Sequence, residues 1–191
     1  MLRRLGLLAA VMMIALAAAG PARAQRLDGP DSTYSGQEII DAGHIFFGRL
    51  TQGFAQAVER LVSQYGQPNG YILGEEGSGA FIGGLRYGEG LLYTRNAGNH
   101  RVYWQGPSIG FDAGGEGTRT MILVYNLPAV EALFQRYPGA SGSAFVIGGV
   151  SVSAVENAGT TLAPIRTGLG ARLGLNVGYL KFTREPTWNP F

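Results

Sequence analysis

The sequence predicts a mainly β protein: a small antiparallel β-barrel of about eight or more short strands, preceded by an amphipathic helix. From Tyr71 onward, apolar residues alternate with polar or small ones, as expected for strands with one buried face. Turns rich in Gly, Asn and Pro interrupt this alternation, without the long helices of a parallel βαβ fold. Closing such a sheet into a barrel would also remove its exposed edges.

Two helices are expected before the strands. Ser35 and Glu38 have the spacing of a capping box, which starts a short helix that Gly43 would end or bend. A longer helix is predicted from Phe46 to Tyr65, where apolar residues recur every three or four positions. We expect its apolar stripe to pack on the β core, with a membrane-surface or partner-binding helix as the alternative. Its polar face lacks the Lys and Arg of interfacial helices.

The most informative stretch is residues 80–119, where two aromatic-rich runs flank Asn96-Ala-Gly-Asn99, a turn sequence typical of a β-hairpin. A short helix is predicted near 128–136, between Pro128 and Pro138. The expected strands cover residues 71–74, 79–87, 90–96, 100–105, 107–113, 117–126, 143–155, 159–165 and 169–182.

The N-terminus resembles a secretory signal peptide. Arg3 and Arg4 precede an apolar run from Leu5 to Ala19, and Ala22-Arg23-Ala24 has the Ala-x-Ala form of a cleavage site. The alternative is a membrane anchor, but the run is shorter than the roughly 20 residues of a spanning helix. We therefore expect cleavage after Ala24 and export to the periplasm. The expected organisation is a signal peptide (1–24), a flexible leader (25–34) and a single domain (35–191), helical over 35–66 and a β-barrel over 71–191.

Composition narrows the classes of function. The chain has 15 Lys and Arg against 13 Asp and Glu, but three of the arginines lie in residues 1–24, so the remainder carries 12 basic and 13 acidic residues. This balance does not support nucleic-acid binding. The chain has no cysteine, which excludes disulfides, thiolate chemistry and cysteine-based metal sites. We expect no cofactor.

No catalytic pattern stands out, and we expect the protein not to be an enzyme. His44 and His100 are the only histidines, and no nucleophile elbow, phosphate loop or dinucleotide fingerprint is complete. The adjacent Glu75 and Glu76 would point to opposite faces of a strand and could not act as a pair. A minor alternative is a glycan hydrolase in which Glu89 works with Asp112 or Glu116.

Aromatic and basic residues are mixed within the hairpin. Such residues stack on sugar rings or hold lipid phosphates, although aromatic residues also fill barrel cores and arginines also pair with carboxylates. The candidate ligand-binding residues are Arg86, Tyr87, Glu89, Arg95, His100, Arg101 and Trp104.

Specific strings carry a family resemblance. They are the run from Gly88 to Gly117, Ala163-Pro-Ile-Arg-Thr-Gly168, Tyr179-Leu-Lys-Phe-Thr183 and the ending Thr187-Trp-Asn-Pro-Phe191. Together they resemble the EipA family of periplasmic envelope-integrity proteins of Gram-negative bacteria, a domain of unknown function. The resemblance implies a periplasmic β-barrel that keeps the envelope robust, and it supplies no catalytic residues.

A more distant likeness concerns Tyr87-Gly-Glu-Gly90, Trp104-x-x-Pro107 and Ser108-Ile-Gly-Phe111. These glycine-bracketed positions are similar to the SYLF lipid-binding domain, which raises lipid binding as a function. The main hypothesis is a noncatalytic periplasmic protein that binds an envelope lipid, glycan or protein partner and does not span the membrane. The alternative is a small integral outer-membrane β-barrel, which Pro186, Pro190 and the short strands oppose.

Overall fold

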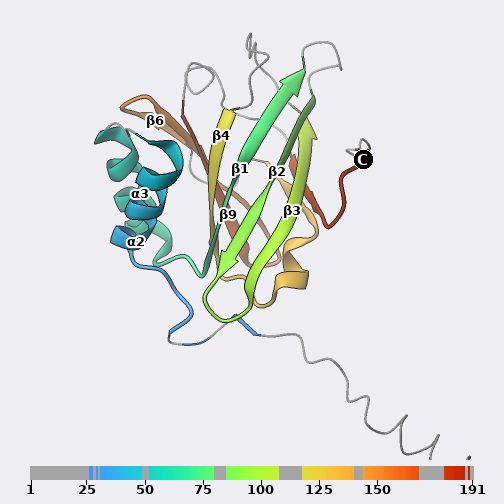
Figure 1. Ribbon diagram of the computed structural model, residues 1–191, viewed down its shortest axis with the longest axis horizontal. Coiled ribbons are helices and arrows are strands. Elements are labelled where there is room, and N and C mark those ends of the chain that lie inside the picture. The colour runs from blue at the N-terminus through green and yellow to red at the C-terminus, as the bar shows by residue number, and fades with distance from the viewer. Residues whose placement is uncertain are drawn as a thin grey trace, which may run out of the picture.

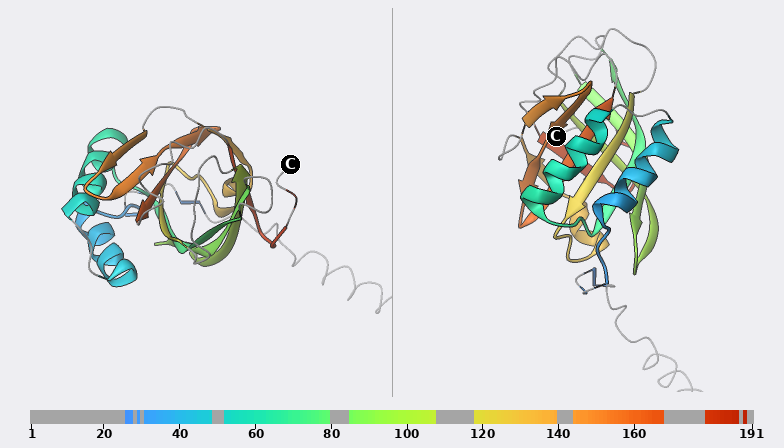
Figure 2. Two further views of the ribbon diagram at one scale, coloured as in Figure 1. Left: turned by 90° about the horizontal axis from the view of Figure 1, so that it is seen from above. Right: turned by 90° about the vertical axis from the view of Figure 1, so that its left-hand side faces the viewer.

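The chain folds into a strongly curled antiparallel sheet with two helices on its outside (Figures 1 and 2). The computed structural model describes residues 26–27, 29, 31–48, 52–79, 85–107, 118–139, 144–167, 179–187 and 189. The mainly β fold predicted from the sequence is confirmed. The expected signal peptide, Asp112, Glu116 and most of the expected strand 169–182 lie outside the described residues.

The helices are α2 (Gly36–Phe47) and α3 (Gln52–Tyr65). The predicted capping box is present, since the Ser35 side chain accepts from the Glu38 amide and Glu38 accepts from the Ser35 amide. Of the two alternatives for Gly43, the one in which it ends the first helix is wrong, because α2 continues to Phe47. The prediction that the second helix begins at Phe46 is also wrong, because α3 begins at Gln52. Gly43 is buried inside α2, where any side chain would overlap the ring of Phe54. The glycine therefore lets the two helices pack closely.

The ten strands are β1 (Gly70–Gly79), β2 (Leu85–Thr94), β3 (Gly98–Pro107), β4 (Thr118–Tyr125), β5 (Arg136–Pro138), β6 (Ala144–Ile147), β7 (Val150–Ser153), β8 (Val155–Asn157), β9 (Thr160–Thr167) and β10 (Tyr179–Thr183). Their order across the sheet is β5-β10-β3-β2-β1-β4-β9-β7-β6, and β8 pairs with the free half of β9. The expected hairpin is confirmed as β2–β3, with Gly98 at a φ of +78°.

Several sequence predictions in the β region are wrong. The strand expected at 71–74 runs on to Gly79, and the single strand expected at 143–155 is divided into β6, β7 and β8. The break expected between strands 79–87 and 90–96 does not exist, because β2 runs unbroken through Gly88 and Gly90. These glycines make room for side chains and backbone of neighbouring strands rather than ending a strand. The helix expected near 128–136 is reduced to a single 3-10 turn, Val130–Leu133, because residues 136–138 pair with β10 and bury Tyr137.

The sheet has an inner face, which is buried, and an outer face, which is buried where the helices pack on it. The inner face encloses one apolar core, with Ile72, Trp104 and Phe182 among its members. The outer face of β4 and β9 packs against the helices through residues such as Leu123 and Ile165. Figure 2 shows α2 and α3 side by side over this part of the sheet, around β4. On the outer face of β1, Tyr71 and Leu73 also pack against this second core, whereas Glu75, farther along the strand, is exposed.

Side-chain hydrogen bonds join β8 to the segment around β5, two parts of the sheet that are not paired through main-chain hydrogen bonds. Nδ2 of Asn157, in β8, donates to the main-chain oxygen of Arg136, in β5, at 2.7 Å and to Oε1 of Gln135 at 3.0 Å. At the same end, the Leu27 amide donates to the Pro128 oxygen and the Leu27 side chain is fully buried. Part of the segment expected to be a leader therefore belongs to the core. In the part of the chain described, no helix has the length and apolarity needed to cross a membrane.

Candidate functional site

A buried carboxylate, Glu76, lies on the inner face at the centre of a polar group that we call the inner cluster: Glu76, Arg86, Trp104 and Arg166. Oε1 of Glu76 accepts from Nε of Arg166 at 2.9 Å, and Oε2 accepts from Nε1 of Trp104 at 2.9 Å. Nη1 of Arg86 lies 3.5 Å from Oε1. All four side chains are nearly or fully buried, so the charges are shielded from solvent.

Strand register explains why these residues meet. Glu76 of β1 is opposite Gly88 of β2, and Gly88 is opposite Trp104 of β3. The indole therefore crosses the middle strand, over a residue with no side chain, to reach the carboxylate. A Cβ at residue 88 would overlap the indole, and one at Gly74 would lie 2.8 Å from its Cη2. The indole of Trp104 thus packs against two strand positions that have no side chain.

The electrostatics of the inner cluster favour a permanently charged carboxylate. Burial alone would raise the pKa of Glu76, but the guanidinium groups of Arg166 and Arg86 outweigh that effect and hold the pKa well below its usual range. Arg86 also donates to the Pro107 oxygen at 2.9 Å, and Arg166 lies 3.4 Å from the hydroxyl of Ser153. The cluster is a satisfied network that joins β1, β2, β3 and β9, and Glu76 cannot donate a proton near neutral pH.

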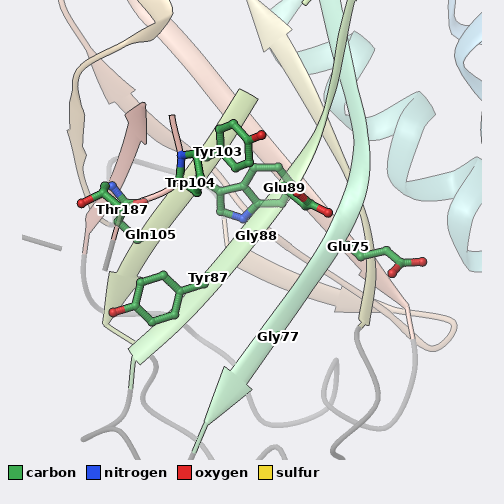
Figure 3. A pocket seen from close by; sticks show the side chains of 10 residues that line it. Glu75, Gly77, Tyr87, Gly88, Glu89, Tyr103, Trp104, Gln105 and Thr187 are labelled. Carbon is green, nitrogen blue, oxygen red and sulfur yellow. The ribbon is translucent and has the colours of Figure 1, made fainter. Parts of the chain in front are cut away.

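On the other side of the same strands lies a pocket of about 350 Å³, which we call the outer pocket (Figure 3). Figure 3 shows its side chains projecting from β1, β2 and β3, with Glu75 and Thr187 at opposite sides. Its lining residues are Glu75, Gly77, Tyr87, Gly88, Glu89, Tyr103, Trp104, Gln105, Pro186 and Thr187.

Cross-strand pairing arranges the outer pocket as two rows. Gly77, Tyr87 and Gln105 form one row, and Glu75, Glu89 and Tyr103 form the next. The two tyrosines are therefore diagonal neighbours on adjacent strands, within reach of one another's aromatic rings. Gly77 leaves the position opposite Tyr87 open, since a Cβ there would meet no atom within 4 Å.

Gln105 is the unusual member of the outer pocket. It is 1% exposed, and its Nε2 finds no hydrogen-bond acceptor in the described part of the protein. Burying an amide group without a partner costs about 1–3 kcal/mol. An unmet donor in the lining of a pocket indicates a place for an oxygen atom of a ligand or of water.

The candidate residues from the sequence fall into three places. Arg86 and Trp104 belong to the inner cluster, while Tyr87 and Glu89 line the outer pocket. Arg101 stands beside the pocket, with Nη1 3.6 Å from Oε2 of Glu89.

The other two candidates lie near the β2–β3 turn. Arg95 pairs with Glu38 and donates to the Thr33 oxygen at 2.7 Å, and Nε2 of His100 lies 2.8 Å from the Ala97 oxygen. These contacts tie the hairpin to the start of α2 and to its own turn. The structure does not bring these two residues to the pocket.

Reading the sequence alone missed the most instructive residues of both sites. Glu76 and Arg166 are 90 positions apart, and only the pairing order of β1, β4 and β9 brings them together. Tyr103 and Gln105 could have been predicted, because residues two apart in a strand lie on the same face and both follow Arg101 at this spacing. Among the described residues, no group of three or more His, Asp or Glu is placed to hold a metal.

Comparison with known proteins identifies the family. The model of the family described as EipA, envelope integrity protein A, matches residues 32–191. The chain belongs to the EipA family. The chain is also similar to a crystal structure described as a beta-barrel-like, uncharacterized protein from Brucella abortus. The two are 58% identical, with a TM-score of 0.79 over 84% of this chain and 99% of that one. A search of proteins with curated functions gave no match.

Proposed function

We propose that this member of the EipA family is a noncatalytic periplasmic protein that maintains envelope integrity by binding an envelope component. The observation that carries the proposal is the outer pocket, whose lining holds a buried amide donor with no acceptor in the part of the chain that the structure describes. A pocket of this kind suits recognition, because a few fixed polar groups orient a ligand between aromatic side chains. The family description supports the link to the envelope.

The charged groups favour binding over hydrolysis. A glycan hydrolase needs one carboxylic acid that stays protonated near neutral pH beside one that is ionised. Glu76 remains ionised and points away from the outer pocket, and Glu89 faces Arg101 at the surface. Of the other carboxylates considered for hydrolysis, Asp112 and Glu116 lie outside the described residues.

The outer face of the sheet also favours a protein that does not span the outer membrane. Glu75, Glu89 and Arg101 are exposed on β1, β2 and β3, and two helices cover β4 and β9. In a membrane barrel this face would meet lipid, where a basic residue costs about 2–4 kcal/mol at the bilayer midplane.

Deletion of the gene in its host, followed by growth in detergent and in cell-wall inhibitors, tests this function. We expect the deletion strain to be sensitive and the full chain to restore resistance. A chain with residues 1–24 replaced by a proven cleavable signal should restore it equally, and a chain lacking 1–24 should not. Normal resistance of the deletion strain, or rescue by the chain lacking 1–24, would contradict the proposal.

A further inference from the structure

We propose that the outer pocket binds a neutral saccharide, an inference that rests on the proposed function and names the class of envelope component. It concerns the face of β1, β2 and β3 opposite to the inner cluster. Aromatic surface, hydrogen-bonding groups, charge and size each point to this class of ligand.

The tyrosines supply the apolar contact that a sugar ring needs. Tyr87 and Tyr103 are partly buried and occupy diagonal positions on β2 and β3, so their rings border the same space. Tyrosine offers a flat apolar face for the C–H groups of a pyranose and a hydroxyl for its polar edge. Both residues are set on paired strands, which limits the ordering cost of binding.

The polar groups match hydroxyl and acetamido groups. Nε2 of Gln105 presents a buried donor for which the described residues offer no acceptor, and Glu75 and Glu89 present acceptors at the exposed side of the pocket. A sugar hydroxyl can donate to a carboxylate and accept from an amide at the same time. The unmet donor would then gain its partner on binding.

Charge argues against a phosphate or an anionic lipid headgroup. Among the described residues, two carboxylates and no basic side chain line the outer pocket, and Arg101, beside it, faces Glu89. Phosphate sites are instead built around Arg, Lys or several main-chain amides. The volume of about 350 Å³ is near the lower end of ordinary ligand sites, roughly 300–1,000 Å³. That space suits one or two sugar rings rather than acyl chains.

The test measures binding to purified residues 25–191 by ligand-observed NMR and calorimetry. The probes are the N-acetylglucosamine trimer, maltotriose, and vesicles of phosphatidylcholine with and without phosphatidylglycerol. We expect saturable binding of at least one trisaccharide, insensitive to salt, and none to either vesicle. Binding only to phosphatidylglycerol vesicles, or no saccharide binding, would overturn the proposal.

Gly77→Leu locates the site, because Gly77 lines the pocket and a Cβ at residue 77 would meet no atom within 4 Å, so the added side chain would occupy pocket space. It should weaken saccharide binding about ten-fold or more, a loss of about 1.4 kcal/mol, with an unchanged melting temperature. Gly29→Leu is the matched control, since a Cβ at residue 29 also meets nothing within 4 Å and lies outside the pocket. Unchanged affinity in Gly77→Leu would place the ligand elsewhere and overturn the assignment.

Gln105→Met separates binding from folding. Removing a buried amide that has no partner should leave the free energy of unfolding unchanged or higher. The same change should lower the affinity for the saccharide. Lower stability would show that the amide already has a partner and would remove this part of the argument. If the wild-type gene does not restore resistance to the deletion strain, the proposed function is wrong, but the saccharide site in the outer pocket is not contradicted. Full resistance conferred by Gly77→Leu, despite lost binding, would defeat the pocket's role but not the proposed function.

Discussion

Trp104 donates a 2.9 Å hydrogen bond to Glu76 from two strands away, across a position that glycine leaves open. The indole and the carboxylate can meet only because residue 88 of the intervening strand has no side chain. This relationship makes a strand glycine, normally a weak point of a sheet, a requirement for the buried network.

Gly88→Ala should therefore destabilise the protein by about 1–3 kcal/mol, the usual cost of overpacking a core. The added Cβ would overlap the indole and force it away from Glu76. Urea unfolding followed by tryptophan fluorescence measures both the loss of stability and the altered environment. Gly77→Ala is the matched control, with open space at its Cβ, and equal stability losses in the two variants would contradict the explanation.

Glu76→Gln should destabilise the protein by about 3–5 kcal/mol, because it leaves buried guanidinium groups without their counter-charge. Arg166 and Arg86 would both lose the carboxylate that neutralises them. Chemical denaturation measures the change. Glu89→Gln, which affects an exposed pair with Arg101, should change stability by no more than about 1 kcal/mol. Similar effects from the two changes would show that burial of the Glu76 pair is not decisive.

Acid should weaken the fold in a window set by Glu76. Its pKa falls from an ordinary 4.5 to about 2 in the folded protein, because Arg166 and Arg86 outweigh burial. A lowered pKa stabilises the fold above the unfolded-state value, and this contribution is lost as the pH drops from about 4.5 to about 2. Denaturation at a series of pH values should show this decline.

The same pH series on Glu76→Gln should give a shallower decline. Part of the slope should remain, because hydrogen bonds from the Ser35 amide and from Arg95 also lower the pKa of Glu38 to about 2. An equally steep decline in the variant would assign the acid sensitivity to other carboxylates.

Ser35→Ala should cost about 1 kcal/mol by removing the N-cap of α2. The change also loosens Glu38, which pairs with Arg95 on the β2–β3 turn, so protection of the first turn against hydrogen exchange should fall. Ser63→Ala, at an exposed position inside α3, should be neutral or slightly stabilising because alanine favours helix interiors. A larger loss from Ser63→Ala would refute this account.

Local signals in the sequence were sufficient for part of the fold. The capping box at Ser35, the turn before Gly98 and the opposite faces of Glu75 and Glu76 all follow from short-range rules, and the structure confirms them. The continuity of β2 through Gly88 did not follow, because the reason for that glycine lies in a side chain on the next strand.

The inner cluster shows the same limit more strongly. Arg86 stood out as a candidate for binding, yet its partner Glu76 makes it part of the core. The strand order that joins Glu76 to Arg166 depends on pairing between distant segments. The sequence predicted only part of the outer pocket: Tyr87 and Glu89 were candidate ligand-binding residues, and Gln105 was not. An amide becomes informative only when its burial and missing partner are known.

The short strands at the two ends of the sheet path have a consequence for how copies of the protein meet. Of the described strands, β5 has three residues and ends in Pro138, and β6 has four. Long, flat edges offer main-chain groups on which another molecule can add a strand, whereas short edges and proline discourage it. At the β6 end, the turn at Gly148 is also pressed against Gly53 of α3. We therefore expect little strand-to-strand aggregation through these two ends of the sheet, even at high protein concentration.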